Sequence, residues 1–311
     1  MIPEWGTHWN LTDTSCVPHD WRTTLRKRWK EVGLGFVTLI IVAFAVTGAQ
    51  LRIIKLAPHD VGPLVVTLVV VLTYLASVRW IERRPVDEFA PRGATREMFA
   101  GLATGFALFS SVMGILWIAG VYHPAGFGIP KGIATGLALA ILSGVFEEIL
   151  FRGILFRASS RIVGTWGALL FTSAIFGLAH LANKGATFSS GVAIMLEAGI
   201  LLGAAYALTG RLWMPIGLHI AWNFAEGSVF GMSISGNSLA GLGDSGLLRG
   251  TLSGPPILTG GAFGPEASVV AVVTCFLLAV YLLYRTVKLR RIDAPAWSGE
   301  RRAGATQLVV G

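Results

Sequence analysis

Two adjacent glutamates inside an apolar segment constrain this chain more than any other feature of its sequence. The segment reads GIATGLALAILSGVFEEILFRGILF over residues 132–156, and it is apolar apart from Glu147, Glu148 and Arg152. A charged side chain at the centre of a membrane helix costs about 2.5–3.5 kcal/mol on insertion scales, so such residues are rare and usually paired or functional. We therefore expect a fold that spans a membrane and gives these carboxylates polar partners.

The composition agrees with a membrane protein, since 53% of the residues are hydrophobic and only 14% are charged. Soluble domains carry about 25% charged residues. A membrane helix needs about 20 mostly apolar residues. The sequence predicts an all-α polytopic membrane protein with about eight transmembrane helices. Their expected ranges are 33–51, 63–81, 99–121, 132–156, 163–182, 190–209, 213–232 and 267–285.

The basic residues predict the orientation of these helices. Eight crossings leave 20 of the 25 lysines and arginines on one side and only Arg52, Lys55, Lys131, Lys184 and Arg249 on the other. Cytoplasmic loops carry the excess of basic residues. We therefore place both termini in the cytoplasm of an integral protein, in the plasma membrane of a prokaryote. The net charge of +8 then reflects topology and anionic lipid, and we expect no nucleic-acid partner.

The same pattern divides the chain into segments. We expect a cytoplasmic N-terminal lead at 1–30, two helices with a cytoplasmic loop at 31–98, and a core at 99–232. A glycine-rich external loop at 233–266 precedes the last helix at 267–291 and a cytoplasmic tail at 292–311. Cys16 and Cys275 have no evident disulfide partner. The sequence gives neither an oligomeric state nor a role for the glycine-rich loop.

Helical spacing assigns different tasks to the two glutamates. Glu148 and Arg152 lie four residues apart with the acid first, which is the favourable order for an ion pair on one helix face. Glu147 points about 100° away and lacks a partner on its own helix. Glu147 is therefore available as a general base. In the alternative interpretation, both acids only bridge helices through Arg152.

Two further predicted helices carry polar groups at the same spacing. His180 follows Phe176 by four residues, and Asn223 follows His219 by four. His180 is a candidate acid–base partner or metal ligand, and His219 with Asn223 can donate hydrogen bonds to an oxyanion. Each pair is alternatively a structural link between membrane helices.

Two isolated acids are harder to interpret. Glu226 follows Asn223 by three residues on nearly the same face. It belongs to the site or marks the external interface, and we favour the interface. Glu197 is a lone acid in the sixth predicted helix. It lines the cavity, or it pairs with Arg211 or His219.

Together these residues resemble a known family. EEILFR fits the pattern EExxxR, FGLAH fits FxxxH and HIAWN fits HxxxN, in that order on successive predicted helices. The chain resembles the CPBP family, the CAAX prenyl protease and bacteriocin-processing (Abi) intramembrane proteases, over roughly residues 100–230. The resemblance implies an intramembrane endopeptidase that acts on a membrane-associated peptide or protein.

The resemblance also implies roles for individual residues. Glu147 and His180 match the residues that activate the attacking water. His219 and Asn223 match the pair proposed to stabilise the oxyanion, and Glu148 and Arg152 match the supporting glutamate and arginine. The cavity is then expected between the fourth, fifth and seventh helices.

The chemistry of water activation has two versions. The sequence lacks HExxH, yet Glu147, His180 and His219 form a His₂Glu set that is compatible with catalytic Zn²⁺. That version needs Glu148 as the base, although Glu148 is expected to pair with Arg152. We favour metal-free chemistry, in which no cofactor is required.

The shared site sets a geometric condition. At 1.5 Å per residue, Glu147 and His180 lie about 22 and 27 Å from the predicted turn between their helices, whereas His219 lies only about 10 Å from its own turn. The three meet only if the fourth and fifth helices extend at least about 12 Å further into the cytoplasm than the sixth and seventh. We expect His219 within about 12 Å of Glu147 on this reasoning.

Other functions remain open from the sequence. A non-catalytic immunity or scaffold protein would keep the cavity and bind peptides. A proton-coupled transporter would use the glutamates and Arg152 as a relay, but no inverted repeat is evident.

Overall fold

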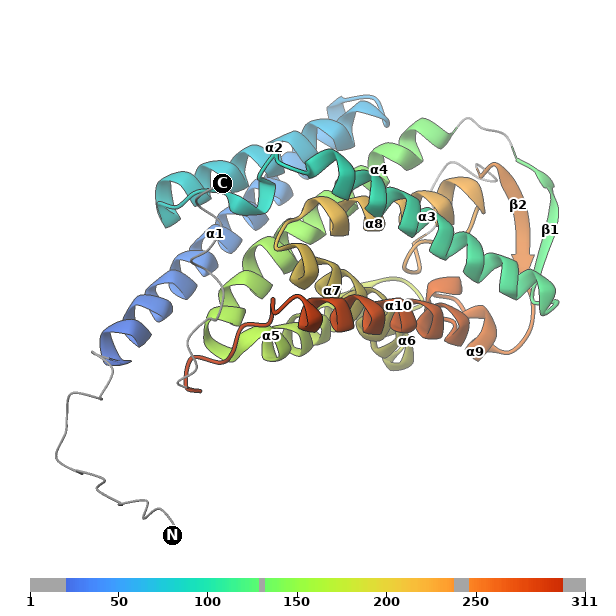
Figure 1. Ribbon diagram of the computed structural model, residues 1–311. Helices are drawn as coiled ribbons and strands as arrows, with labels where there is room; N and C mark the ends of the chain where they lie inside the picture. The colour runs from blue at the N-terminus through green and yellow to red at the C-terminus, as the bar shows by residue number, and fades with distance from the viewer. Residues whose placement is uncertain (1–20, 129–131, 238–245, 299–311) are drawn as a thin grey trace, which may run out of the picture.

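A computed structural model describes residues 21–128, 132–237 and 246–298 (Figure 1). Cys16, Lys131 and parts of the predicted lead, glycine-rich loop and tail lie outside these ranges. The described chain is a bundle of mostly long helices, with a two-stranded antiparallel sheet at one end. The predicted all-α polytopic membrane fold is therefore confirmed.

The N-terminal part consists of three long helices. Helix α1 spans Trp21–Leu56, α2 spans Val61–Ser77 and continues into the π-helix η2 at Val78–Glu82, and α3 spans Ala94–Ile118 after the short 3₁₀ turn η3 at Asp87–Phe89. Helix α1 begins well before the expected residue 33, because the lysines, arginines and glutamate that precede the apolar run are good helix formers.

The central part is one continuous helical segment that reverses its direction once, which we call the α4–α5 excursion. Helix α4 spans Ile133–Glu148 and runs on through the π-helix η5 at Ile149–Phe156 into α5 at Arg157–Ala179, which ends in the 3₁₀ turn η6 at His180–Ala182. The chain reverses at Gly164, whose φ of 72° and ψ of 177° break the helix. The first arm of this segment, residues 133–163, is thus about 46 Å long at 1.5 Å per residue. It exceeds the ~30 Å hydrocarbon core, as the extended fourth helix requires.

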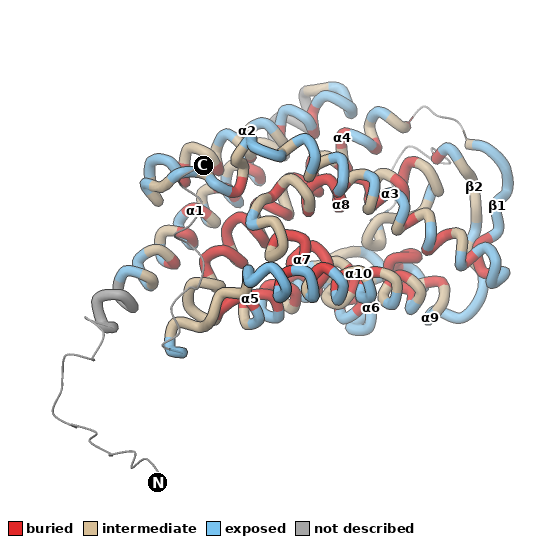
Figure 2. Tube along the Cα trace, viewed as in Figure 1, coloured by how far each residue is buried: buried red, intermediate tan, exposed pale blue. Residues whose placement is uncertain are grey.

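Five shorter helical segments complete the core. Helix α6 spans Phe188–Ile194 and continues through the π-helix η7 at Met195–Gly199 into α7 at Ile200–Thr209. Helix α8 spans Trp213–Phe224 and ends in the π-helix η8 at Ala225–Val229. Figure 2 shows that the buried residues concentrate on α7, α8 and the middle of the α4–α5 excursion.

A small sheet, which the sequence analysis did not predict, lies at the end of the bundle away from the start of α1. Strands β1 at Tyr122–Phe127 and β2 at Leu248–Leu252 pair antiparallel with a bulge between Pro124 and Gly126. The chain then forms α9 at Pro256–Thr259, the 3₁₀ turn η9 at Pro265–Ala267 and α10 at Val269–Lys288.

Six stretches are long and apolar enough to cross a membrane, among the residues that the structure describes. They are Lys27–Ala49, Val61–Glu82, Ala94–Ile118, Ile133–Ala182, Phe188–Thr209 and Val269–Lys288. The fourth contains the reversal at Gly164 and so holds two predicted helices. The seventh predicted helix corresponds to α8 and η8, which fall short of this length, so the count of eight crossings stays a prediction.

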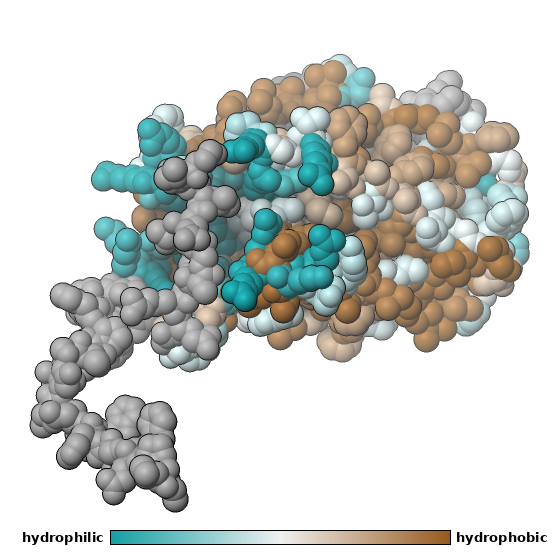
Figure 3. Space-filling view, in the orientation of Figure 1, coloured by the Kyte–Doolittle hydropathy of each residue, from teal (hydrophilic) through white to brown (hydrophobic). Residues whose placement is uncertain are grey.

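Hydrophilic side chains gather at one end of the molecule, where α1 begins and α10 ends, and apolar side chains cover most of the rest of the visible face (Figure 3). This distribution is the one that a bilayer imposes on a helical bundle. The cytoplasmic placement of that end remains a prediction.

Close helix packing fixes α8 within the bundle. A methyl group on Gly105 of α3 would lie 2.2 Å from the carbonyl oxygen of Leu218 in α8, and one on Gly144 of α4 would lie 2.7 Å from Ile220. Only glycine allows backbones to approach this closely. These contacts hold His219, which is flanked by Leu218 and Ile220, against α4.

Candidate active site

Three helices bring one glutamate and two histidines together. Glu147 lies in the last turn of α4, His180 at the end of α5 and His219 in α8. The Oε2 atom of Glu147 lies 4.0 Å from Nε2 of His180 and 4.0 Å from Nε2 of His219. The separation of Glu147 and His219 therefore meets the 12 Å condition set by the sequence.

The second nitrogen of each histidine fixes the tautomer. Nδ1 of His180 lies 2.8 Å from the carbonyl oxygen of Phe176, and Nδ1 of His219 lies 3.0 Å from Oε1 of Glu148. A carbonyl or carboxylate oxygen only accepts, so each Nδ1 donates its hydrogen. In neutral histidines the Nε2 lone pairs are then directed at Glu147.

This arrangement places three hydrogen-bond acceptors around one point. A separation of 4.0 Å is too long for a direct hydrogen bond, but a water molecule between the groups reaches them. Oε2 of Glu147 is buried and has no hydrogen-bond partner in the protein. A water molecule there would donate to the carboxylate and to one imidazole, which is the geometry needed to remove its proton.

The predicted pair of Glu148 and Arg152 is present. Nη1 of Arg152 donates to Oε1 of Glu148 over 2.8 Å, and Nη2 donates to the carbonyl oxygens of Ala198 at 3.3 Å and Gly199 at 2.9 Å. Glu148 is fully buried and Arg152 is 1% exposed. Because Oε1 of Glu148 also accepts from His219, the pair fixes the imidazole as well as joining α4 to η7.

Phe176 has a role that spacing alone does not show. Its ring lies 4.9 Å from the guanidinium carbon of Arg152 and 4.6 Å from the His180 ring. A cation over an aromatic face is stabilised by the ring quadrupole. Phe176 therefore supports both the arginine and the histidine, and its carbonyl oxygen fixes the histidine's tautomer.

Asn223 lies one turn beyond His219 on α8. Its Nδ2 donates to Oγ of Ser143 over 2.9 Å. Ser143 stands one helical turn before Glu147 on α4, so this hydrogen bond aligns the amide beside the glutamate. The sequence analysis missed Ser143, because a serine in a membrane helix carries no distinctive pattern.

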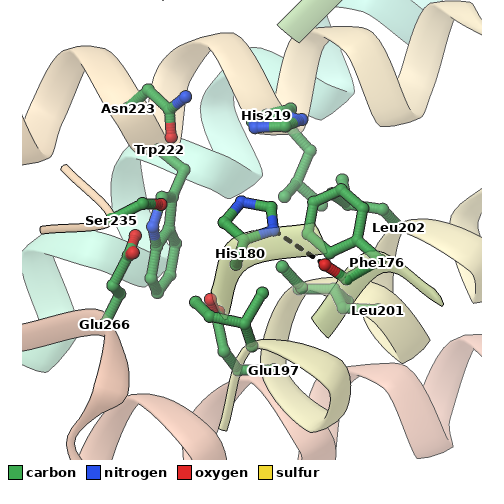
Figure 4. A pocket seen from close by; sticks show the side chains of 13 residues that line it. Phe176, His180, Glu197, Leu201, Leu202, His219, Trp222, Asn223, Ser235 and Glu266 are labelled. Carbon is green, nitrogen blue, oxygen red and sulfur yellow. Dashed lines mark hydrogen bonds between the residues drawn. The ribbon is translucent and has the colours of Figure 1, made fainter. Parts of the chain in front are cut away.

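These groups open into a cavity of about 30 Å³, which has room for a water molecule. Figure 4 shows His219 and Asn223 on one side, His180 near the middle, and Glu197 and Glu266 on the other side. Ser235 and Trp222 also contribute to its wall. All six predicted catalytic residues thus lie in or directly behind one site.

Three further acids surround this cavity. Glu197 lines it, as one of the expectations had it, and Arg211 pairs with Glu97 instead. Glu226 was expected at the external interface, and this was wrong: its side chain is fully buried, because loop residues 233–237 and 260–267 fold over it. Glu266 was missed, since one acid in a glycine-rich loop carries no signal. Burial raises the pKa of the Glu266 carboxyl.

The donor types suit zinc, but their spacing does not. A tetrahedral zinc ion with bonds of about 2.0–2.1 Å holds its ligand atoms about 3.3 Å apart, whereas Glu147 lies 4.0 Å from each imidazole. Within the described residues, no group of three or more histidine, cysteine or acidic side chains is arranged to hold a metal ion. In this geometry the three side chains do not have the spacing of zinc ligands.

Comparisons with known proteins agree with the motifs. Residues 129–225 match the family model described as "Type II CAAX prenyl endopeptidase Rce1-like". The chain is also 32% identical over 84 residues to the "Putative membrane peptidase YdiL" of Bacillus subtilis (strain 168). That match covers 27% of this chain and 32% of the relative, so it spans about a third of the relative's length. No solved structure matches the chain significantly.

The matched region contains all three motifs, from Glu147 to Asn223. The family model and the relative confirm the resemblance to the CPBP family. The matched region ends just before Glu226 and does not include Glu266.

Proposed function

We propose that this chain is an intramembrane endopeptidase that hydrolyses a peptide bond in a membrane-associated peptide or protein, with a water molecule activated by Glu147. The convergence of the Glu147 carboxylate and the Nε2 atoms of two imidazoles at 4.0 Å carries the proposal. The family match adds a substrate class, the C-terminus of a CAAX-type protein or another processed peptide. The bilayer holds such a substrate beside the site.

The first step activates the water. The water molecule donates one hydrogen bond to Oε2 of Glu147 and the other to Nε2 of His180. Glu147 accepts a proton as the water oxygen attacks the carbonyl carbon of the peptide bond. The electron pair of the carbonyl bond moves to its oxygen, which becomes an oxyanion. General base catalysis of this kind contributes about 10²–10⁴-fold.

The oxyanion is stabilised from α8. His219 takes part in its protonated form throughout, as the carboxylate of Glu148 favours, and its Nε2–H donates to the oxyanion without being transferred, as does the amide of Asn223. Arg152 keeps Glu148 in place. Donors fixed before the reaction need no reorganisation as charge develops.

Collapse of the intermediate completes the reaction. The oxyanion reforms the carbonyl bond, the carbon–nitrogen bond breaks, and the leaving amine takes the proton held by Glu147. The products are a carboxyl and an amino terminus, and the enzyme regains its starting protonation state. The reaction consumes one water molecule and needs no other co-reactant.

The test is peptide cleavage by the purified protein in lipid nanodiscs, with a mixed peptide library that includes prenylated peptides and with products identified by mass spectrometry. The decisive variant is Glu147→Gln, and the control is Asp87→Asn, which changes an exposed acid outside the cavity. We expect products from the wild type and the control that disappear in Glu147→Gln.

Equal cleavage by wild type and Glu147→Gln would contradict the assignment of the base. A wild-type protein that binds library peptides but leaves them intact would favour the scaffold function, since binding would then be independent of Glu147.

A further inference from the structure

Three buried acids, Glu197, Glu226 and Glu266, form a group that we call the acid pocket; Glu197 and Glu266 lie in the cavity wall and Glu226 contacts Glu266. Each comes from a different element: η7, η8 and η9. Their exposed fractions are 2%, 0% and 2%. Glu197 and Glu266 line the same cavity as His180 and His219.

The acid pocket lacks the partners that buried acids normally have. None of the three forms an ion pair with a lysine or arginine within the part of the chain that the structure describes. Neither oxygen of Glu226, nor Oε1 of Glu266, accepts a hydrogen bond of good geometry. The Glu226 and Glu266 carboxyl groups contact each other, and when both are ionised neither can donate to the other. In that doubly ionised state a donor is missing at this place.

The orientation of the side chains connects the pocket to the reaction site. In Figure 4 the Glu197 carboxyl group points toward His180, and Glu266 lies beside Ser235 and Trp222. The unpartnered Glu266 oxygen is therefore buried in a wall of the cavity in which the peptide bond would be cut.

Charge, size and hydrogen-bonding capacity together describe the missing donor. Buried carboxylates are stable when paired with a cation. A primary ammonium group offers three donors and no acceptor. It is also close in size to a water molecule, which the cavity admits. The planar guanidinium of arginine needs more room.

We propose that the acid pocket recognises a primary ammonium group of the substrate, carried by a lysine side chain near the cut bond or by a free amino terminus. This inference rests on the proposed function and names the substrate feature that the same site selects. Two of the three acids, Glu226 and Glu266, lie outside the region that the family model matches.

The first test measures kcat/KM for matched peptides in nanodiscs. One series places lysine, norleucine or acetyl-lysine near the cut site, with an acetylated amino terminus, and another compares free and acetylated termini. We expect the wild type to prefer the peptide with the ammonium group by about tenfold or more, because removing one member of a buried charge pair has effects of this size. The series that shows the preference identifies the source of the ammonium group.

Substitutions in the acid pocket test whether its carboxylates cause the preference for the ammonium group. Glu266→Gln should reduce the ratio between lysine and norleucine peptides to about one, and Glu197→Gln provides a second variant if the first does not fold. Asp87→Asn should keep the wild-type ratio. Cleavage by the wild type with equal rates for all members of both series would overturn the inference and leave the proposed function standing.

A binding measurement separates the two proposals. The probes are N-acetyl-lysine amide and N-acetyl-norleucine amide, and the readout is the Tm of the wild-type protein and of Glu266→Gln. We expect only the lysine probe to raise Tm, and only in the wild type. If this holds while no peptide is cut, the acid pocket stands and the proposed function fails. If neither probe changes Tm and no peptide is preferred, the acid pocket does not bind ammonium.

Discussion

Two buried groups of charges in this molecule are built in opposite ways. The first, which we call the arginine–glutamate cluster, consists of Glu82, Arg84, Glu88 and Arg157 near the end where α1 begins. Each arginine contacts both glutamates, at distances from 2.7 to 3.1 Å. Burial opposes the charge of Arg84, but the hydrogen bond and charge of Glu88 outweigh it, so the pKa of Arg84 is raised.

The second group surrounds the cavity and is unbalanced. It holds five glutamates, two of the active site and three of the acid pocket, against two histidines and a single arginine. That arginine, Arg152, is already held by Glu148 and two backbone carbonyl groups. Glu147, Glu226 and Glu266 each retain a buried oxygen without a donor.

The comparison distinguishes charges that stabilise the fold from charges that are available to bind a substrate or a water molecule. Two arginines that balance two glutamates fix the positions of η2, η3 and α5, and each of these glutamates pairs with both arginines. Buried acids without a cationic partner destabilise a fold. In the cavity, such acids are available to bind the attacking water and a cationic group of the substrate.

The largest expected effect compares one acid from each group. Glu88→Gln should lower the free energy of unfolding by up to about 3–5 kcal/mol, because it leaves the buried Arg157 and the partly buried Arg84 with one glutamate. Glu147→Gln should leave the free energy of unfolding within about 1 kcal/mol of wild type, because that carboxylate has no arginine or lysine partner and its contacts with the two histidines, at 4.0 Å, are longer than hydrogen bonds. Unfolding in mixed micelles with increasing denaturing detergent measures both.

This prediction would fail if Glu147→Gln destabilised the protein as much as Glu88→Gln does. Glu147 would then be a structural bridge between helices, as in the alternative interpretation of the sequence. An exposed arginine, changed as Arg96→Met, should alter the free energy of unfolding by no more than about 0.5 kcal/mol and serves as the control.

The next effect concerns the oxyanion donor. Asn223→Ala should lower kcat by about 10²–10³-fold, as removal of one fixed oxyanion donor does elsewhere. Ser143→Ala keeps the amide but removes the oxygen that orients it, so its effect on kcat should be smaller. Steady-state kinetics on one cleaved peptide measures both, and an Asn223→Ala enzyme with unchanged kcat would remove the amide from the mechanism.

A smaller effect is expected at Phe176, whose ring lies against Arg152, the partner of Glu148. Phe176→Leu keeps most of the apolar volume but removes the aromatic face beneath Arg152, a contact worth about 1–2 kcal/mol when it is desolvated. The free energy of unfolding should fall by that amount. Phe171→Leu changes a half-exposed phenylalanine on the same helix and should have little effect. Equal losses in the two variants would show that only apolar volume matters.

The sequence predicts the parts of this molecule that depend on local spacing. Apolar runs locate the membrane stretches, and the four-residue spacing of Glu148 and Arg152 predicts their contact. The long first arm of the α4–α5 excursion follows from requiring His219 to reach Glu147. These predictions work because a bilayer leaves a helix few alternatives.

Tertiary packing decides the rest. The π-helices η5, η7 and η8 follow or contain Glu148, Glu197 and Glu226, yet π-helical turns have no local sequence pattern and are common at functional sites. Burial of Glu226 depends on a loop far along the chain, and Glu266 reaches the cavity only because that loop folds inward. Neither follows from helical periodicity.

The smallest expected effect is none, and it tests the role of the two histidines. Glu147 lies 4.0 Å from each imidazole, further apart than the ligands of one zinc ion, and a water molecule bridges that separation. If the three groups activate water directly, treatment with o-phenanthroline followed by dialysis should leave kcat/KM unchanged. Added Zn²⁺ should not raise it.

Loss of activity that Zn²⁺ restores would show that the three side chains move together around a metal ion, and Glu148 would then have to leave Arg152 to act as the base. A variant with His180→Gln distinguishes the two cases further, because it should weaken zinc retention only if zinc is bound.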